Sequence, residues 1–231
     1  MTDDQKGQQD RSRLIDHFKR VYTIVAGLAI TEAVKRQLPL SSSEFPTPSF
    51  WMFCTFLVTL VPIFHGGDRS LDVKYLGAQP VTAQGRFWYL WDVYILLITA
   101  MLFVCIAEAI PATGLPASKQ TLMAETTQFY NLMALTLAFD AVALTIDAIK
   151  SDRQLLPRLS SYVVWIPANL ALAGICIYTA SLAASASDAT AILIQTKIYD
   201  LDLLAVTLGV ALLALLRTVL DYWAGRDFLF P

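Results

Sequence analysis

The stretch from Phe87 to Ile110, FWYLWDVYILLITAMLFVCIAEAI, decides the fold of this chain. A helix of this length, rising about 1.5 Å per residue, measures about 36 Å and can cross a hydrocarbon core of about 30 Å. The aromatic residues at its start are typical of the membrane interface, and Pro111 follows its end. We therefore expect a transmembrane helix here.

The composition of the whole chain agrees with a membrane location. Hydrophobic residues make up 56% and charged residues 16% of the 231 residues, whereas about 25% of an ordinary soluble domain is charged. The net charge is −2, so no nucleic-acid partner is implied. This composition excludes an ordinary soluble enzyme and makes the lipid bilayer the expected surroundings.

Working outward from Phe87–Ile110, further apolar segments occur on both sides and are expected to form helices. They are Val21–Val34, Phe50–Phe64, Phe129–Ile149, Tyr162–Ala183 and Leu201–Leu220. The first is short, and its basic flanks must snorkel to the interface. The second is expected to kink or end at Pro62. The fold class is therefore an all-α, polytopic bundle of six predicted spans.

The domain organisation follows from these spans. We expect a basic, amphipathic N-terminal segment at residues 1–20, one transmembrane domain at 21–223 and a short tail at 224–231. The first twenty residues are too polar for a cleaved signal peptide, since no apolar region precedes the first span. No stretch between the spans is long enough for a separate soluble domain.

Six spans distribute the basic residues unevenly, and this predicts the orientation. Four of the seventeen lie on one side: Lys35, Arg36, Lys119 and Lys197. The other thirteen lie on the side of both termini: Lys6, Arg11, Arg13, Lys19, Arg20, Arg69, Lys74, Arg86, Lys150, Arg153, Arg158, Arg217 and Arg226. The bias would vanish if the first segment did not cross. Both termini are predicted to be cytoplasmic, in a bacterial inner membrane.

A cluster of polar residues that could bind a ligand or take part in gating follows the second span. His65, Asp68, Arg69 and Asp72 surround Gly66-Gly67, which is a natural helix end. We treat them as candidates for binding or gating in a cytoplasmic loop. If the helix continued, His65, Arg69 and Asp72 would share one face. The structural alternative is a capped helix terminus with local ion pairs.

A second group consists of acidic residues inside the spans. Asp140 and Asp147 are seven residues apart and share a helix face with Thr136. Ionisable groups in lipid are costly, so they normally face a partner, a bundle interior or water. We take these three residues, with Glu32, as candidates for an ion or proton pathway. The alternative is static pairing within the bundle.

Two other polar positions carry local expectations. Arg217 and Asp221, four residues apart, are expected to form a local ion pair. Asp92 lies beside the aromatic residues that open its span, so it is expected at the solvated membrane interface.

Motifs of catalysis and cofactor binding are missing from the sequence. It contains no GxSxG, HExxH, GxxxxGK[ST] or GxGxxG pattern. The three cysteines lie in apolar runs, and neither His17 nor His65 lies deep in one, so neither a metal nor a haem is expected. No catalytic residue and no cofactor are assigned.

Three functional hypotheses remain. The first is a small oligomeric bundle that passes ions or protons along an acidic interior. The second is a non-catalytic scaffold, or a subunit of a membrane partner protein. The third is a cytoplasmic-face membrane enzyme using His65 and Asp68. The sequence ranks them in this order.

Overall fold

The computed structural model describes residues 3–38, 46–75, 83–113, 118–150, 159–187 and 196–229. This part of the chain contains α-helices and no strands. The helices are α1 (Asp3–Gln37), α2 (Pro48–Tyr75), α3 (Ala83–Glu108), α4 (Lys119–Lys150), α5 (Leu159–Ser187) and α6 (Thr196–Leu229). The predicted all-α fold is confirmed, with one helix at each of the six predicted segments. Each helix begins before the apolar run that identified it, and all of them except α3, which ends at Glu108, also continue past its end.

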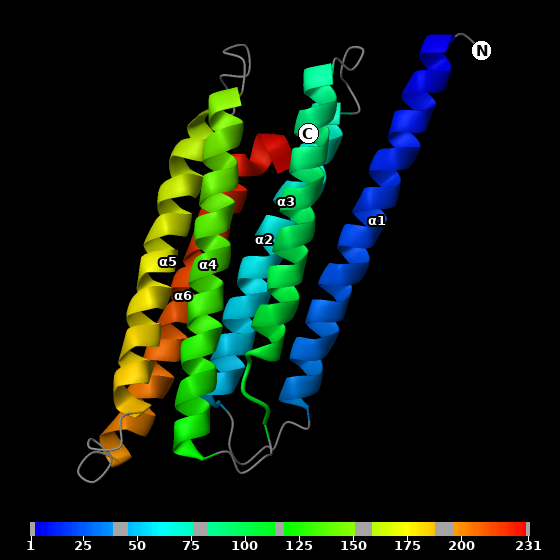
Figure 1. The fold of residues 1–231 in the computed structure, drawn as a ribbon. Helices are drawn as coiled ribbons and strands as arrows, with labels where there is room; N and C mark the ends of the chain where they lie inside the picture. The colour runs from blue at the N-terminus through cyan, green and yellow to red at the C-terminus, as the bar shows by residue number, and fades with distance from the viewer. Residues whose placement is uncertain are drawn as a thin grey trace.

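The helices run alternately up and down, so the start of α1 and the end of α6 lie at the same end of the bundle (Figure 1). We call this the terminal end and the other the distal end. The closest neighbours are α4 with α5, α2 with α6, and α1 with α3. α1 lies at the edge of the bundle, against α3 and α2 (Figure 1). The side of the membrane on which the termini lie stays a prediction.

Five helices of the described part, α2 to α6, are long and apolar enough to cross a membrane. By the same measure of length and composition, α1 is not among them. Its apolar run, Val21–Val34, is about 21 Å long at about 1.5 Å per residue, shorter than a hydrocarbon core of about 30 Å. Basic residues flank this run on both sides. α1 would cross a membrane only if the charged residues at both ends of this run reached toward the interface.

The end predicted for the second span at Phe64 is wrong, because α2 continues through Pro62 to Tyr75. A proline inside a helix cannot donate to the carbonyl four residues earlier, which here belongs to Val58. That carbonyl instead accepts a hydrogen bond from Thr218 Oγ1 of α6, at 2.8 Å. The interhelical bond replaces the missing one and lets the helix continue in a membrane.

The helix end predicted at Gly66-Gly67 is also wrong, because α2 continues to Tyr75. Gly67 has a packing role instead. A Cβ placed on Gly67 would lie 2.5 Å from Leu96 Cδ2 of α3 and 3.5 Å from the hydroxyl oxygen of Tyr22. A Cβ on Gly66 would meet nothing within 4 Å. Gly67 thus allows α3 and α1 to pack closely against α2.

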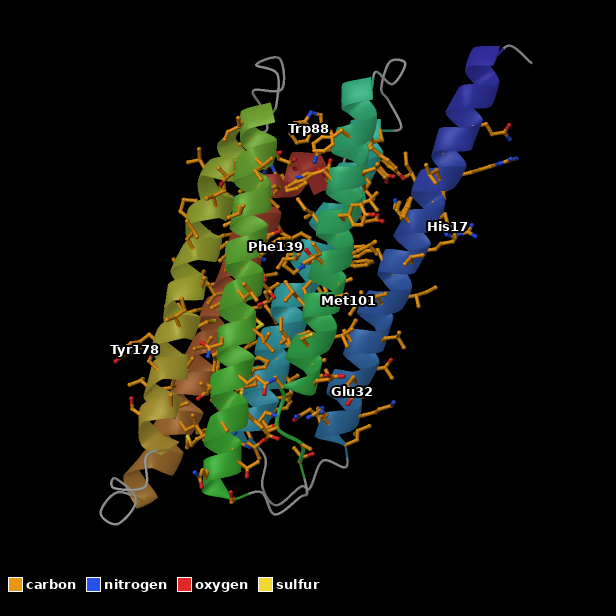
Figure 2. All side chains as sticks on the ribbon, in the orientation of Figure 1. His17, Glu32, Trp88, Met101, Phe139 and Tyr178 are labelled. Carbon is orange, nitrogen blue, oxygen red and sulfur yellow. The ribbon has the colours of Figure 1, made fainter. Side chains whose placement is uncertain are left out.

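The apolar core is densest in the half of the bundle near the distal end. Its largest buried side chains there include Met52, Phe56, Phe103, Phe129 and Met133. Large apolar side chains also cover the outside, as expected where lipid replaces water. Tyr178 of α5 is 65% exposed, and Figure 2 shows its side chain pointing away from the bundle.

Candidate functional site: a charged cavity

A cavity of about 110 Å³ lies between α2, α3, α4, α5 and α6. It lies toward the terminal end, above the apolar core. The charged residues that line it come from four helices. They are Lys74 of α2, Asp92 of α3, Asp140 and Asp147 of α4, and Arg217 and Asp221 of α6.

Three of these residues form a group that we call the lysine triad: Asp92, Lys74 and Asp147. The Nζ atom of Lys74 lies 3.1 Å from Asp92 Oδ2 and 2.6 Å from Asp147 Oδ2. The hydroxyl of Tyr75 donates a further hydrogen bond to Asp92 Oδ2, at 2.6 Å. The lysine triad therefore ties α2, α3 and α4 together through one cation.

The other three residues form the arginine triad: Asp140, Arg217 and Asp221. Arg217 Nη1 lies 2.5 Å from Asp221 Oδ2, and Arg217 Nη2 lies 4.0 Å from Asp140 Oδ2. The amide of Asn169 on α5 connects the two helices. It donates to Asp140 Oδ2 at 2.6 Å and accepts from Arg217 Nε at 2.9 Å. The local pair predicted for Arg217 and Asp221 is confirmed.

The two triads share an unusual charge balance. Each places one cation between two carboxylates, so each carries a charge of −1 when all its groups are ionised. Asp221 is only 4% exposed, and its Oδ1 atom has no hydrogen-bond partner among the described residues. An uncompensated charge is costly in a membrane interior. The cavity is therefore suited to take up a proton or a cation.

A similar arrangement joins α1 to α2 outside the cavity. Lys19 Nζ lies 3.0 Å from Asp68 Oδ2 and 2.9 Å from Asp72 Oδ2. Burial disfavours the ammonium charge of Lys19, but the hydrogen bonds and charges of Asp72 and Asp68 outweigh it and raise the pKa of Lys19 above its ordinary value. This contact anchors α1, the least apolar helix, to the bundle.

The group predicted at His65 is divided between two neighbouring helices. Asp68 and Asp72 face Lys19 of α1, whereas His65 Nδ1 lies 3.3 Å from the hydroxyl of Tyr222 on α6. Arg69 is half-buried on the same helix. These residues lie within α2 and not in a loop, so the expected loop location is wrong. His65 and Asp68 contact different helices.

The predicted acidic pathway is divided in a similar way. Asp140 and Asp147 both line the cavity. Thr136 is buried away from it, and its hydroxyl donates to Leu132 O of its own helix at 2.9 Å. Glu32 lies near the distal end of α1, where its Oε1 is 3.2 Å from Arg36 Nε (Figure 2). Thr136 and Glu32 therefore lie apart from the charged cavity.

Several residues of the site were not found from the sequence. In the sequence, Lys74 contributes only to the charge bias that predicts the orientation, and no pattern singles out Asn169. Asp92 was expected at the solvated interface, but its side chain is only 11% exposed and belongs to the lysine triad. Lys74 lies ten residues after the end of the second apolar run. A second helix longer than this run would therefore include Lys74. The part of the chain that the structure describes contains no group of His, Cys, Asp and Glu able to hold a metal ion.

Comparisons with protein-family models, with curated proteins and with solved structures found no match to this chain. The class of protein is therefore defined by the fold and the cavity. It is an all-helical membrane protein with helices apolar enough to span the membrane and a charged cavity lined by five of them.

Proposed function

We propose that this protein binds protons or small cations in the charged cavity and moves them across the membrane. The observation that carries the proposal is the charge balance of the two triads, each with one cation between two carboxylates. Uptake of one proton or monovalent cation by each triad would neutralise the cavity. Binding is favourable because it removes the cost of unbalanced charge in a low-dielectric region.

The apolar half of the bundle supports movement by rearrangement instead of through an open pore. Met52, Phe56, Phe103 and Phe129 are buried between the cavity and the distal end. A cation leaving the cavity toward that end must displace these side chains or wait until the helices separate. Apolar constrictions of this kind act as gates in membrane proteins.

The orientation is also part of the proposal. The excess of basic residues at the terminal end favours a cytoplasmic location for both termini. The cavity would then lie in the cytoplasmic half of the membrane, in contact with the inner ion and proton pool. A bacterial inner membrane fits this arrangement, and self-association would place several such cavities side by side.

Flux through liposomes containing the purified protein tests this proposal. The informative variant is Asp140→Asn, because the amide keeps a group able to bond Asn169 and removes only the charge. We expect proton or K⁺ flux to fall about tenfold, corresponding to ~1.4 kcal/mol at the binding step. The matched control is Asp16→Asn, which removes an exposed carboxylate of α1 and should leave flux unchanged.

Two results would contradict the proposal. One is equal flux in the parent and the Asp140→Asn variant, with both proteins folded. The other is a reproducible absence of proton, Na⁺ and K⁺ flux at two pH values with the folded parent. Absence of flux would favour the role of a scaffold or partner subunit, in which the triads only hold helices together.

A further inference from the structure

We infer that the preferred occupant of the cavity is a small organic ammonium ion, bound by Asp221 and by the aromatic rings of Tyr162 and Trp165. This inference rests on the proposed function and names the class of cation. Three independent features of the cavity support it: its aromatic wall, a carboxylate oxygen free to accept a hydrogen bond, and its size.

The aromatic wall comes from α5. Tyr162 and Trp165 both line the cavity, with ring centroids 6.1 Å apart and planes at 89°. The indole Nε1 of Trp165 donates to the backbone oxygen of Asp221, at 3.4 Å, which holds the ring beside that residue. Aromatic faces next to a carboxylate are the usual recognition elements for alkylammonium ions, because the ring quadrupole attracts the cation and its alkyl part.

The carboxylate of Asp221 belongs to the lining of the cavity. Its Oδ2 atom pairs with Arg217, whereas its buried Oδ1 atom has no hydrogen-bond partner among the described residues. An unsatisfied buried oxygen is costly, and an ammonium N–H group would satisfy it.

The volume of the cavity and the positions of its carboxylates favour a small organic cation. A cavity of about 110 Å³ is smaller than the engineered cavities of about 150 Å³ that hold benzene. A cation of a few heavy atoms, such as ethylammonium, therefore fits within it. The carboxylates lie in two separate triads, and the described residues form no cluster that could hold a metal ion. An alkylammonium ion suits this spread of charge better than a divalent metal.

Equilibrium binding of radiolabelled ethylammonium to the full chain in lipid nanodiscs tests the inference. We expect saturable binding that Asp221→Asn weakens about tenfold or more, as expected for loss of a charged hydrogen-bond acceptor. Trp165→Leu should weaken it about fivefold, and Trp165→Phe should restore part of the loss. Trp223→Leu is the matched control, because Trp223 lies on the outside of α6 and is 69% exposed.

Competition separates an ammonium site from a general cation site. Ethylammonium binding should resist excess K⁺, and tetramethylammonium should compete poorly because it has no N–H donor. The inference is overturned if ethylammonium does not bind, or if K⁺ displaces it as well as unlabelled ethylammonium does. It is also overturned if Trp165→Leu and Trp223→Leu bind ethylammonium with the same affinity. Asp140-dependent flux without ethylammonium binding would contradict this inference alone. Asp221-dependent binding without any flux would contradict only the proposed transport.

Discussion

Replacing Lys74 by methionine should destabilise the bundle strongly, because it leaves two carboxylates facing each other without their cation. Lys74 Nζ lies 3.1 Å from Asp92 Oδ2 and 2.6 Å from Asp147 Oδ2. At an effective dielectric of about 20, each contact contributes roughly 5 to 6 kcal/mol of attraction. Most of this attraction offsets the cost of removing three charges from water.

The net loss of unfolding free energy in Lys74→Met can be estimated from how deeply the lysine triad is buried. Removing one partner of a buried ion pair costs about 3 to 5 kcal/mol. The side chains of Lys74, Asp92 and Asp147 are 25%, 11% and 18% exposed to solvent. We therefore expect the lower end, about 3 kcal/mol, for Lys74→Met.

The assay is reversible unfolding in mixed micelles, followed by circular dichroism. The double variant Lys74→Met with Asp147→Asn should be about 1 to 2 kcal/mol more stable than Lys74→Met alone, because it removes one uncompensated charge. The reasoning would be refuted if Lys74→Met cost less than about 1 kcal/mol, or if the effects of the two substitutions simply added.

Two further predictions concern packing and topology. Gly66→Ala should stabilise α2 by about 0.5 to 1 kcal/mol, because its Cβ meets open space. Gly67→Leu should cost about 1 to 3 kcal/mol, because its side chain meets Leu96; equal unfolding free energies for the two variants would contradict the packing role. Cysteines placed at Ser41 and Ser185 should both react with an impermeant thiol reagent from the outside of intact cells. Labelling of either position only after lysis would contradict the proposed orientation.

The sequence was sufficient to predict the class of fold and the positions of all six helices. An apolar run between charged flanks can be recognised from neighbouring residues alone. In lipid, the backbone polar groups of such a run must be satisfied within the protein, and an α-helix does this. The local pair of Arg217 and Asp221 was predictable for the same reason, because four residues of helix bring them together. The structure adds about one to three turns to several of these runs.

The cavity could not be assembled from the sequence, since its members come from different helices. Asp140 and Asp147 were identified by their spacing, but their partners Lys74, Asn169 and Arg217 depend on which helices are neighbours. The assumed end of α2 also hid Lys74, because a Pro and two Gly residues usually indicate a helix boundary. Thr218, which replaces the hydrogen bond lost at Pro62, and Leu96, which packs against Gly67, lie far away in the sequence.

The most direct test of the charge balance in the cavity is infrared difference spectroscopy of the protein in lipid, between low and high pH without added cations. If each triad neutralises its excess charge with a proton, the parent at low pH should show protonated carboxyl absorption. This absorption should be reduced in both Asp140→Asn and Asp221→Asn but unchanged in Asp16→Asn. Identical spectra of the parent, Asp140→Asn and Asp221→Asn would contradict the claim that the cavity takes up protons.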